Sequence, residues 1–180
     1  MRQALYILAD LDEQDLTWLV RAGRHEPVAP GTSLIREGEP IEYLYIVTEG
    51  RLEVVIGGGA RVAERGVGDL LGEMSLIEKQ LPSATVKALD GVRVLAIPQA
   101  ALRERLRSDL PFAARFYRAL AILLADRLRE LGAKATKPGD EDAAERFARE
   151  HELDEGLLDT LHVAGDRLRR LLKLLEVRPS

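Results

Sequence analysis

Residues 68–88 read GDLLGEMSLIEKQLPSATVKA and change their pattern twice within a short span. An extended segment, Asp69–Leu71, is followed after Gly72 by a run with helical spacing, Glu73–Ile77. From Ser83 onward apolar and polar residues alternate, which indicates a second strand. The first amides of a short helix have no partners inside it and point outward, where they can hold an anion. We therefore expect a strand, one helical turn and a strand that together form a binding site.

Composition narrows the class of protein. The 180 residues carry a net charge of −4 and 46% hydrophobic residues, enough for one domain of ordinary size with a small appendage. The absence of cysteine excludes disulfides, thiolate-bound zinc and cysteine-ligated iron–sulfur clusters. No apolar run approaches the roughly 20 residues that cross a bilayer, and the start lacks the pattern of a signal peptide. We expect a cytoplasmic protein that does not coat nucleic acid.

The first half of the chain alternates short apolar runs with glycine-containing turns. A helix is expected at Asp10–Gly23, with Asp12 as its cap. From Val28 to Val94 the pattern of short apolar runs and turns is typical of an antiparallel sandwich or barrel. The expected strands are Thr32–Ile35, Tyr43–Val47, Leu52–Ile56, Arg61–Ala63 and Val92–Ile97.

The second half has helical periodicity. Helices are expected at Pro98–Arg107 and Pro111–Leu131, the latter ending at Gly132, and two more after Asp140 and Asp154. We therefore divide the chain into a domain, residues 1–132, and a helical extension, residues 133–180. The long helix has an apolar stripe broader than one sheet surface requires, so a second copy of the helix is the expected partner, unless the whole stripe covers the barrel. The expected dimer residues are Phe116, Leu120, Leu123, Leu124, Leu128 and Leu131.

Two segments and the order of the elements resemble the cyclic-nucleotide-binding domain family, which includes the bacterial cyclic-AMP receptor protein and the regulatory subunit of protein kinase A. One segment is Leu34–Glu39, followed by Tyr43–Val47 and Gly50; the other is Leu71–Leu76 with Ser83–Ala88. The resemblance covers about residues 5–132. It implies an α+β fold: an antiparallel double-stranded β-helix, or jelly-roll barrel of the cupin type. An N-terminal helix and a long C-terminal helix would flank this barrel, with a short helical extension after them.

The resemblance also implies that the second segment is a phosphate-binding cassette around a cyclic phosphate and its ribose. Gly72 would let the backbone approach the ligand, and Glu73 would accept a hydrogen bond from the ribose 2′-hydroxyl. Amides near Met74 and Ser75 would face the anion. The alternative interpretation is structural: Gly72 only makes a turn, and Glu73 only caps the short helix. The expected ligand-binding residues are Leu71, Gly72, Glu73, Met74, Ser75, Ser83, Ala84 and Thr85.

The sequence departs from the family at several positions. Pro82 stands where the family has an arginine that grips the phosphate, and proline offers neither a cation nor a donor. Such a charged hydrogen bond contributes roughly 1.5–3 kcal/mol, so we expect a degenerate cassette that binds cyclic AMP poorly. Lys79 could supply a point charge. Ile41 replaces a small residue, and Leu131 and Gly132 replace polar side chains that would contact the base.

Three classes of function follow. The leading one is a non-catalytic sensing or signalling module for a cyclic nucleotide or another small anionic ligand, dimeric through the long helix, with a possible protein partner at the C-terminal helices. One alternative is a Crp/Fnr-type transcription regulator that binds DNA through those helices; another is a scaffold with an empty pocket. An enzyme or a metal site would require clustered histidines, which His25, His151 and His162 do not provide.

Overall fold

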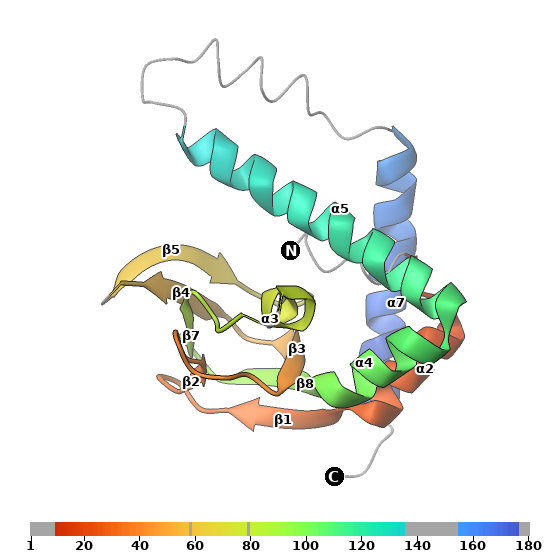
Figure 1. Ribbon diagram of the computed structural model, residues 1–180, viewed down its shortest axis with the longest axis horizontal. Coiled ribbons are helices and arrows are strands. Elements are labelled where there is room, and N and C mark those ends of the chain that lie inside the picture. Colours follow the sequence, from red (N-terminus) through yellow and green to blue (C-terminus); the bar gives the residue numbers. More distant parts are fainter. Residues whose placement is uncertain (1–9, 58, 79, 136–154, 177–180) are drawn as a thin grey trace.

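The strands form two antiparallel sheets that face each other as a roll (Figure 1). The computed structural model describes residues 10–57, 59–78, 80–135 and 155–176, with side chains left undescribed at 129–135, 155–164 and 176. One sheet has the order β1-β8-β3-β6 and the other β2-β7-β4-β5, which confirms the expected α+β jelly roll. The strands are β1 Arg24–Val28, β2 Ser33–Ile35, β3 Tyr43–Glu49, β4 Leu52–Ile56, β5 Ala60–Arg65, β6 Leu70–Leu71, β7 Thr85–Ala88 and β8 Val92–Pro98.

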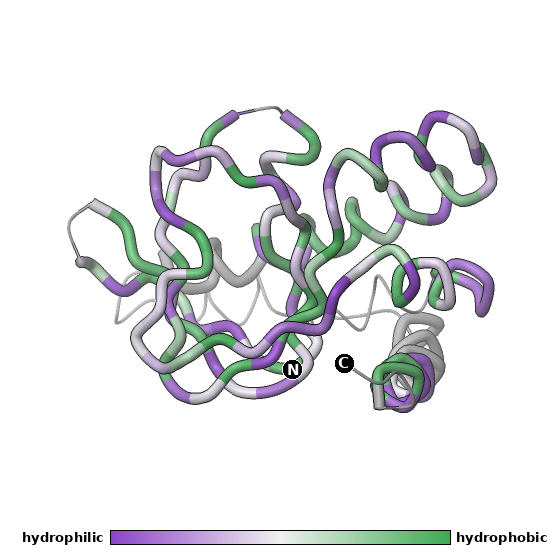
Figure 2. Tube along the Cα trace, turned by 90° about the horizontal axis from the view of Figure 1, so that it is seen from below, coloured by the Kyte–Doolittle hydropathy of each residue, from purple (hydrophilic) through white to green (hydrophobic). Residues whose placement is uncertain are grey.

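Most helices gather on one side of the roll, as the view from below shows (Figure 2). The first expected helix is confirmed: Asp12 caps it, Asp15 completes a capping box, and the chain leaves it at Gly23. The expected helix after Asp154 is confirmed as well, whereas the one after Asp140 lies outside the described residues. The helices are α2 Glu13–Ala22, α3 Glu73–Glu78, α4 Gln99–Ser108, α5 Leu110–Ala135 and α7 Glu155–Glu176.

The end of the long helix is placed differently from the prediction. Gly132 was expected to stop it, but α5 continues through Gly132 to Ala135. A glycine inside a helix costs only about 1 kcal/mol relative to alanine, which neighbouring helix-forming residues can outweigh. The domain boundary at residue 132 therefore falls inside a continuous helix.

Strand β1 was not expected from the sequence. Its five residues include Pro27 and few apolar side chains, so they lack the usual strand pattern. It lies at the edge of its sheet and pairs with β8 alone. An edge strand tolerates proline because one of its sides has no hydrogen-bonding neighbour.

The sheet that contains β3 is covered on both faces. Leu44 and Ile46 of β3 pack against the helices, whereas Tyr45 and Val47 point into the roll. This explains the continuous apolar run in β3, because both faces of a sandwiched sheet exclude water. The outer core includes Leu16, Leu19, Leu95, Ile97, Leu102, Phe112, Phe116, Leu120, Leu123, Leu171 and Leu175. The inner core includes Val28, Ile35, Leu52, Leu71, Val86, Ala88, Val92, Val94 and Ala96.

A buried carboxylate ties three helices together. Asp15 of α2 is fully buried, and its two oxygens accept hydrogen bonds from Arg105 of α4, at 2.7 Å, and Arg115 of α5, at 2.8 Å. The hydrogen bond to Asp15 raises the pKa of Arg115. The guanidinium of Arg105 also lies 3.9 Å from the ring centre of Phe112 and 4.7 Å from that of Trp18. These contacts fix α2 against the junction of α4 and α5.

We predict that Asp15→Asn lowers the free energy of unfolding by roughly 1.5–3 kcal/mol, because Arg105 and Arg115 lose their hydrogen bonds to a buried carboxylate and keep only the more exposed Asp109 and Asp12 as partners. Chemical denaturation of the variant measures this. Glu104→Gln is the matched control: it removes an exposed carboxylate paired with Arg107, and such pairs contribute about 0–1 kcal/mol. An equal loss in the two variants would contradict this role for Asp15.

Candidate functional site

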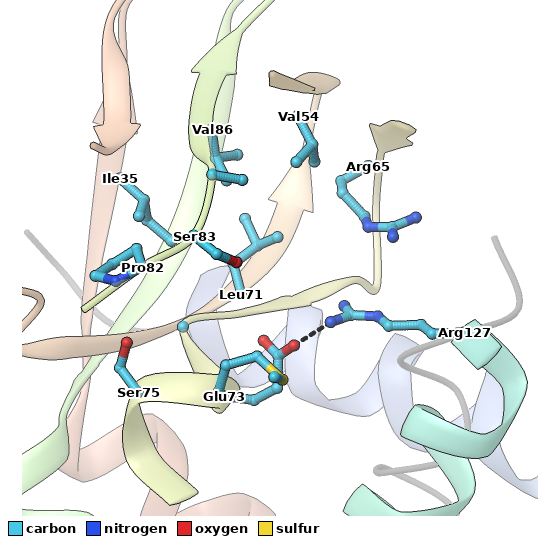
Figure 3. A pocket seen from close by; sticks show the side chains of 13 residues that line it. Ile35, Val54, Arg65, Leu71, Glu73, Ser75, Pro82, Ser83, Val86 and Arg127 are labelled. Carbon is cyan, nitrogen blue, oxygen red and sulfur yellow. Dashed lines mark hydrogen bonds and ion pairs between the residues drawn. The ribbon is translucent and has the colours of Figure 1, made fainter. Parts of the chain in front are cut away.

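A cavity of about 200 Å³ lies between the cassette and the second sheet. Its floor comes from the end of β6 and from α3, and the segment before β7 closes it. Apolar side chains of β2, β4 and β7 form the opposite wall (Figure 3). Residues from distant parts of the sequence meet here because β4 and β5 follow β7 in the second sheet. The lining residues are Ile35, Val54, Arg65, Leu71, Gly72, Glu73, Met74, Ser75, Pro82, Ser83, Ala84, Val86 and Arg127.

Gly72 makes the turn between β6 and α3. Its φ is +87°, in the region that only glycine adopts readily. A Cβ at this position would lie 2.8 Å from the carbonyl oxygen of Tyr43 and 2.8 Å from Ile41 Cδ1. The turn therefore needs glycine for two reasons, and the structural reading of Gly72 holds whether or not a ligand approaches it.

Glu73 is held by an arginine from the long helix. Its side chain is only 3% exposed, and one of its oxygens is ion-paired with Arg127 of α5 (Figure 3). The other terminal nitrogen of Arg127 donates to the carbonyl oxygen of Leu70 at 2.7 Å. Arg127 thus joins the cassette to α5 from both ends of the turn at Gly72.

The sequence contained a signal for Arg127 that the prediction did not use. Arg127 follows Leu120 and Leu123 at helical spacing, so it continues the buried face of α5. A charged residue on a buried face requires a partner, because an isolated buried charge is costly. Glu73 was the only carboxylate singled out in the cassette and was the natural candidate.

Two polar side chains of α4 donate hydrogen bonds to backbone carbonyl oxygens of the cassette. The side-chain amide of Gln99 donates to the carbonyl oxygen of Gly72 at 3.1 Å. Arg103 donates to the carbonyl oxygen of Ser75 at 3.1 Å and to the side-chain oxygen of Gln99 at 2.7 Å. Neither residue was predicted to belong to the site. Their contacts fix the position of α3 relative to α4.

Seven of the eight expected ligand-binding residues line the cavity, and Thr85 is the exception. The Thr85 hydroxyl accepts a hydrogen bond from the backbone amide of Glu37 at 3.0 Å, so it joins two loops of the roll. Pro82 lines the cavity, and its carbonyl oxygen accepts a hydrogen bond from Gly38 at 2.9 Å. Lys79 lies outside the described residues. Arg65 of β5, which the sequence did not single out, also lines the cavity.

His25 lies away from this cavity. Its Nε2 is 2.9 Å from the Thr48 hydroxyl, which itself donates to the carbonyl oxygen of Arg93. Burial and the nearby charge of Arg93 lower the pKa of His25. Among the described residues no group of three or more histidines, cysteines and carboxylates is placed to hold a metal ion.

The expected dimer stripe is partly wrong, because three of its members are buried within their own chain. Phe116, Leu120 and Leu123 belong to the outer core, which also contains Leu171 and Leu175 of α7. The broad apolar surface of α5 is thus covered on one side by α2, α4 and α7. Leu124 is half-buried and Leu128 is 69% exposed, while the side chain of Leu131 is outside the described set.

A second apolar stripe runs along the open side of α5. Its members are separated alternately by four and three residues, the spacing of a coiled-coil seam. All are exposed except the half-buried Leu124. We call these residues the seam: Leu110, Ala114, Tyr117, Ala121, Leu124 and Leu128.

No helix within the described ranges combines the length and the apolarity needed to cross a bilayer.

Comparison with known proteins identifies a family whose members resemble this chain. A family model described as a cyclic nucleotide-binding domain matches residues 25–109. Glutaminase 2 of Bradyrhizobium diazoefficiens is 30% identical over 71% of this chain and 20% of its own length. The chain spans 20% or less of the first curated relatives it matches.

Two solved structures share both fold and sequence with the chain. The N-terminal domain of a transcriptional regulator from Streptomyces coelicolor is 30% identical, with a TM-score of 0.58 over 74% of this chain and 95% of that one. The regulatory subunit of a cAMP-independent protein kinase A from Trypanosoma brucei is 33% identical, with a TM-score of 0.50 over 52% of this chain and 34% of that one.

We predict that Gly72→Ala destabilises the protein more than Gly38→Ala. Both glycines have positive φ, +87° and +77°, so each substitution costs about 1–2 kcal/mol in backbone strain. A Cβ at position 38 meets nothing within 4 Å, whereas one at position 72 meets backbone; overpacking adds roughly 1–3 kcal/mol. Thermal or chemical unfolding of both variants measures the difference, and equal losses would contradict the close approach at Gly72.

Proposed function

The chain belongs to the cyclic nucleotide-binding domain family, and we propose that it acts as a non-catalytic regulatory module that senses a small anionic ligand. The observation that carries this proposal is the cavity beside Gly72 and Glu73, which Arg127 of the long helix also lines. A ligand there would contact the cassette and α5 at once. The match to Glutaminase 2, which covers 20% of that protein, supports a regulatory segment that accompanies other domains.

The ligand need not be cyclic AMP. Pro82 removes the cation expected on the strand that returns from the cassette, so cyclic AMP should bind more weakly than in a cassette with arginine. The relative from Trypanosoma brucei, described as cAMP-independent, supports the use of this fold without that nucleotide. We therefore treat the cassette as degenerate and the ligand as a small anion of the nucleotide type or size.

The Glu73–Arg127 pair gives the ligand a route to the long helix. A ribose hydroxyl that donates to the Glu73 oxygen paired with Arg127 would compete with Arg127 for it. Any change in this pair alters the contact between α3 and α5, since Arg127 also holds the Leu70 carbonyl. A ligand shifts such an equilibrium only by its different affinity for the two arrangements. We propose that this difference arises at Glu73.

We predict that the melting temperature rises with one of four nucleotides: cyclic AMP, cyclic GMP, cyclic di-AMP or cyclic di-GMP. A ligand at 100 times its Kd stabilises the folded state by about 2.7 kcal/mol. For a chain of this size that corresponds to several degrees, at about 2–4 °C per kcal/mol. Inorganic phosphate at equal ionic strength controls for general effects of salt. If no nucleotide raises the melting temperature at millimolar concentration, the sensing function is contradicted and a scaffold remains.

We also propose that the protein is a homodimer through the seam of α5. The seam is apolar over its whole length, and its alternate spacing of four and three residues suits the packing of two such helices. Alanines at positions 114 and 121 would allow the helices to approach closely around Tyr117. The buried face of α5 packs in the outer core of its own chain, whereas the seam would pack against the second copy.

We predict that Leu128→Glu converts the dimer to a monomer, because two carboxylates would face each other across an apolar seam. Sedimentation velocity over a range of protein concentrations measures the oligomeric state. Val62→Glu on β5 is the matched control, since Val62 is also an exposed apolar residue, at 40%, but lies outside the seam. A wild-type protein that sediments as a monomer, or a Leu128→Glu variant that remains dimeric, would contradict the proposal.

The DNA-binding alternative has less support from the position of α7. Leu171 and Leu175 of α7 are buried in the outer core, and Arg170 pairs with Glu13 of α2. These contacts favour α7 as a part of the sensing unit that covers α2 and α5. We therefore propose that a regulatory partner, if one binds here, reads the combined surface of α2 and α7.

A further inference from the structure

A second cavity, of about 300 Å³, lies between β2, β3 and the loop that joins them. β2 and β3 belong to the two facing sheets (Figure 1), so the cavity opens where the roll is bridged by this loop. It is distinct from the cavity beside Gly72, because Ile35 is the one residue that lines both. Its apolar wall includes Leu34, Pro40 and Ile41.

Tyr45 brings a buried hydroxyl group to this second cavity. Tyr45 is only 9% exposed and lines the cavity, and its hydroxyl forms no hydrogen bond within the described part of the chain. Buried polar groups are nearly always hydrogen-bonded, so this hydroxyl is available to a bound molecule. Burial, and to a smaller extent the charge of Glu26, raises the pKa of Tyr45. The phenol therefore stays neutral and can both donate and accept.

The charged residues of this cavity carry a net negative charge. They are Arg36, Glu39 and Glu42. Arg36 lies 3.6 Å from Glu39, so these two charges largely offset each other. Glu42 is exposed, and its carboxylate has neither an ion pair nor a hydrogen bond among the described residues. Glu42 therefore supplies the charge that an occupant of the cavity would meet.

Two aromatic rings add to this preference for positive charge. Tyr43 and Tyr45 both line the cavity, with ring centres 6.0 Å apart. The face of an aromatic ring attracts cations, and Arg24 lies 5.5 Å from the ring centre of Tyr43. Arg24 is itself paired with Glu26 at 3.1 Å, so its charge is compensated. A carboxylate, a phenol and aromatic rings in one apolar cavity suit an organic cation.

We propose that this cavity is a second binding site, which takes a small organic cation with an apolar body. The ammonium group would lie between the Glu42 carboxylate and the Tyr45 hydroxyl, and its carbon atoms would contact the tyrosine rings, Leu34 and Ile41. The site is separate from the proposed sensing of an anion and does not depend on it. Ile41 links the two places, since its Cδ1 is 2.8 Å from the point where a Cβ of residue 72 would stand.

The test is a titration of the full chain with choline and with benzylamine, followed through backbone amide chemical shifts in proton–nitrogen NMR spectra. The control ligands have the same shape without the charge: the analogue of choline with carbon in place of nitrogen, and benzyl alcohol. We expect the cations to shift the amides of Glu42, Tyr43 and Tyr45 and to bind about tenfold more tightly than their neutral analogues. Amides of Glu73 and Ser83, which line only the other cavity, should shift less.

Two variants test the assigned groups. Tyr45→Phe removes only the hydroxyl and should weaken binding of the cations about two- to tenfold. Its melting temperature should match that of the wild type, because the hydroxyl has no partner in the described part of the chain. Glu42→Gln should weaken binding about two- to fivefold. Glu104→Gln is the matched control, with less than a twofold change, since Glu104 is an exposed carboxylate that does not line the cavity.

The proposal is overturned if neither cation shifts the amides of Glu42 and Tyr45 at millimolar concentration, or if the neutral analogues bind as tightly. It is also overturned if Tyr45→Phe and Glu42→Gln bind the cations as the wild type does, or if the shifts are confined to the cassette. None of these results bears on the binding of an anion beside Gly72, because the probes are cations. The two proposals therefore fail or stand separately.

Discussion

The buried ion pair between Glu73 and Arg127 is the contact on which the organisation of the site depends. It joins the short helix of the cassette to the long helix that forms the outer core, and Arg127 extends the connection to Leu70. A buried pair of this kind stabilises little by itself, but removal of one partner leaves an uncompensated charge. The position of α5 and the shape of the cavity are therefore coupled through one carboxylate. A ligand that contacts Glu73 reaches the long helix without any other intermediary.

The long helix has three surfaces with different surroundings. One face packs in the outer core with Phe116, Leu120 and Leu123; Arg127 extends toward the cassette; and the seam faces away from the chain. The position of the helix is fixed at its start by Arg115, which binds the buried Asp15. A shift at the cassette end would thus turn α5 about a fixed start and, in the proposed dimer, would change the angle between the two seams.

Much of the fold could be predicted from local patterns, whereas the contacts of the site could not. The β-strands, the capped helix after Asp12 and the turn at Gly72 follow from alternation, caps and glycine placement, which are short-range properties. Strand β1 was missed because its pairing with β8 outweighs a poor strand pattern. Arg127 and Arg65 were missed because they reach Glu73 and the cavity from elements 54 and 8 residues away from position 73. Three members of the expected dimer stripe, Phe116, Leu120 and Leu123, lie on the covered face of α5. Periodicity shows that a helix is apolar on two sides, but not which neighbour covers each side.

A crystal structure grown with a saturating concentration of the nucleotide that raises the melting temperature tests the central claim most directly, because it locates both the ligand and the Glu73–Arg127 pair. The account predicts density for the nucleotide beside Gly72, with its ribose next to Glu73. It also predicts that the contact of Arg127 with Glu73 differs from that described above. An unoccupied cavity, or a nucleotide bound elsewhere with the Glu73–Arg127 pair unchanged, would contradict it.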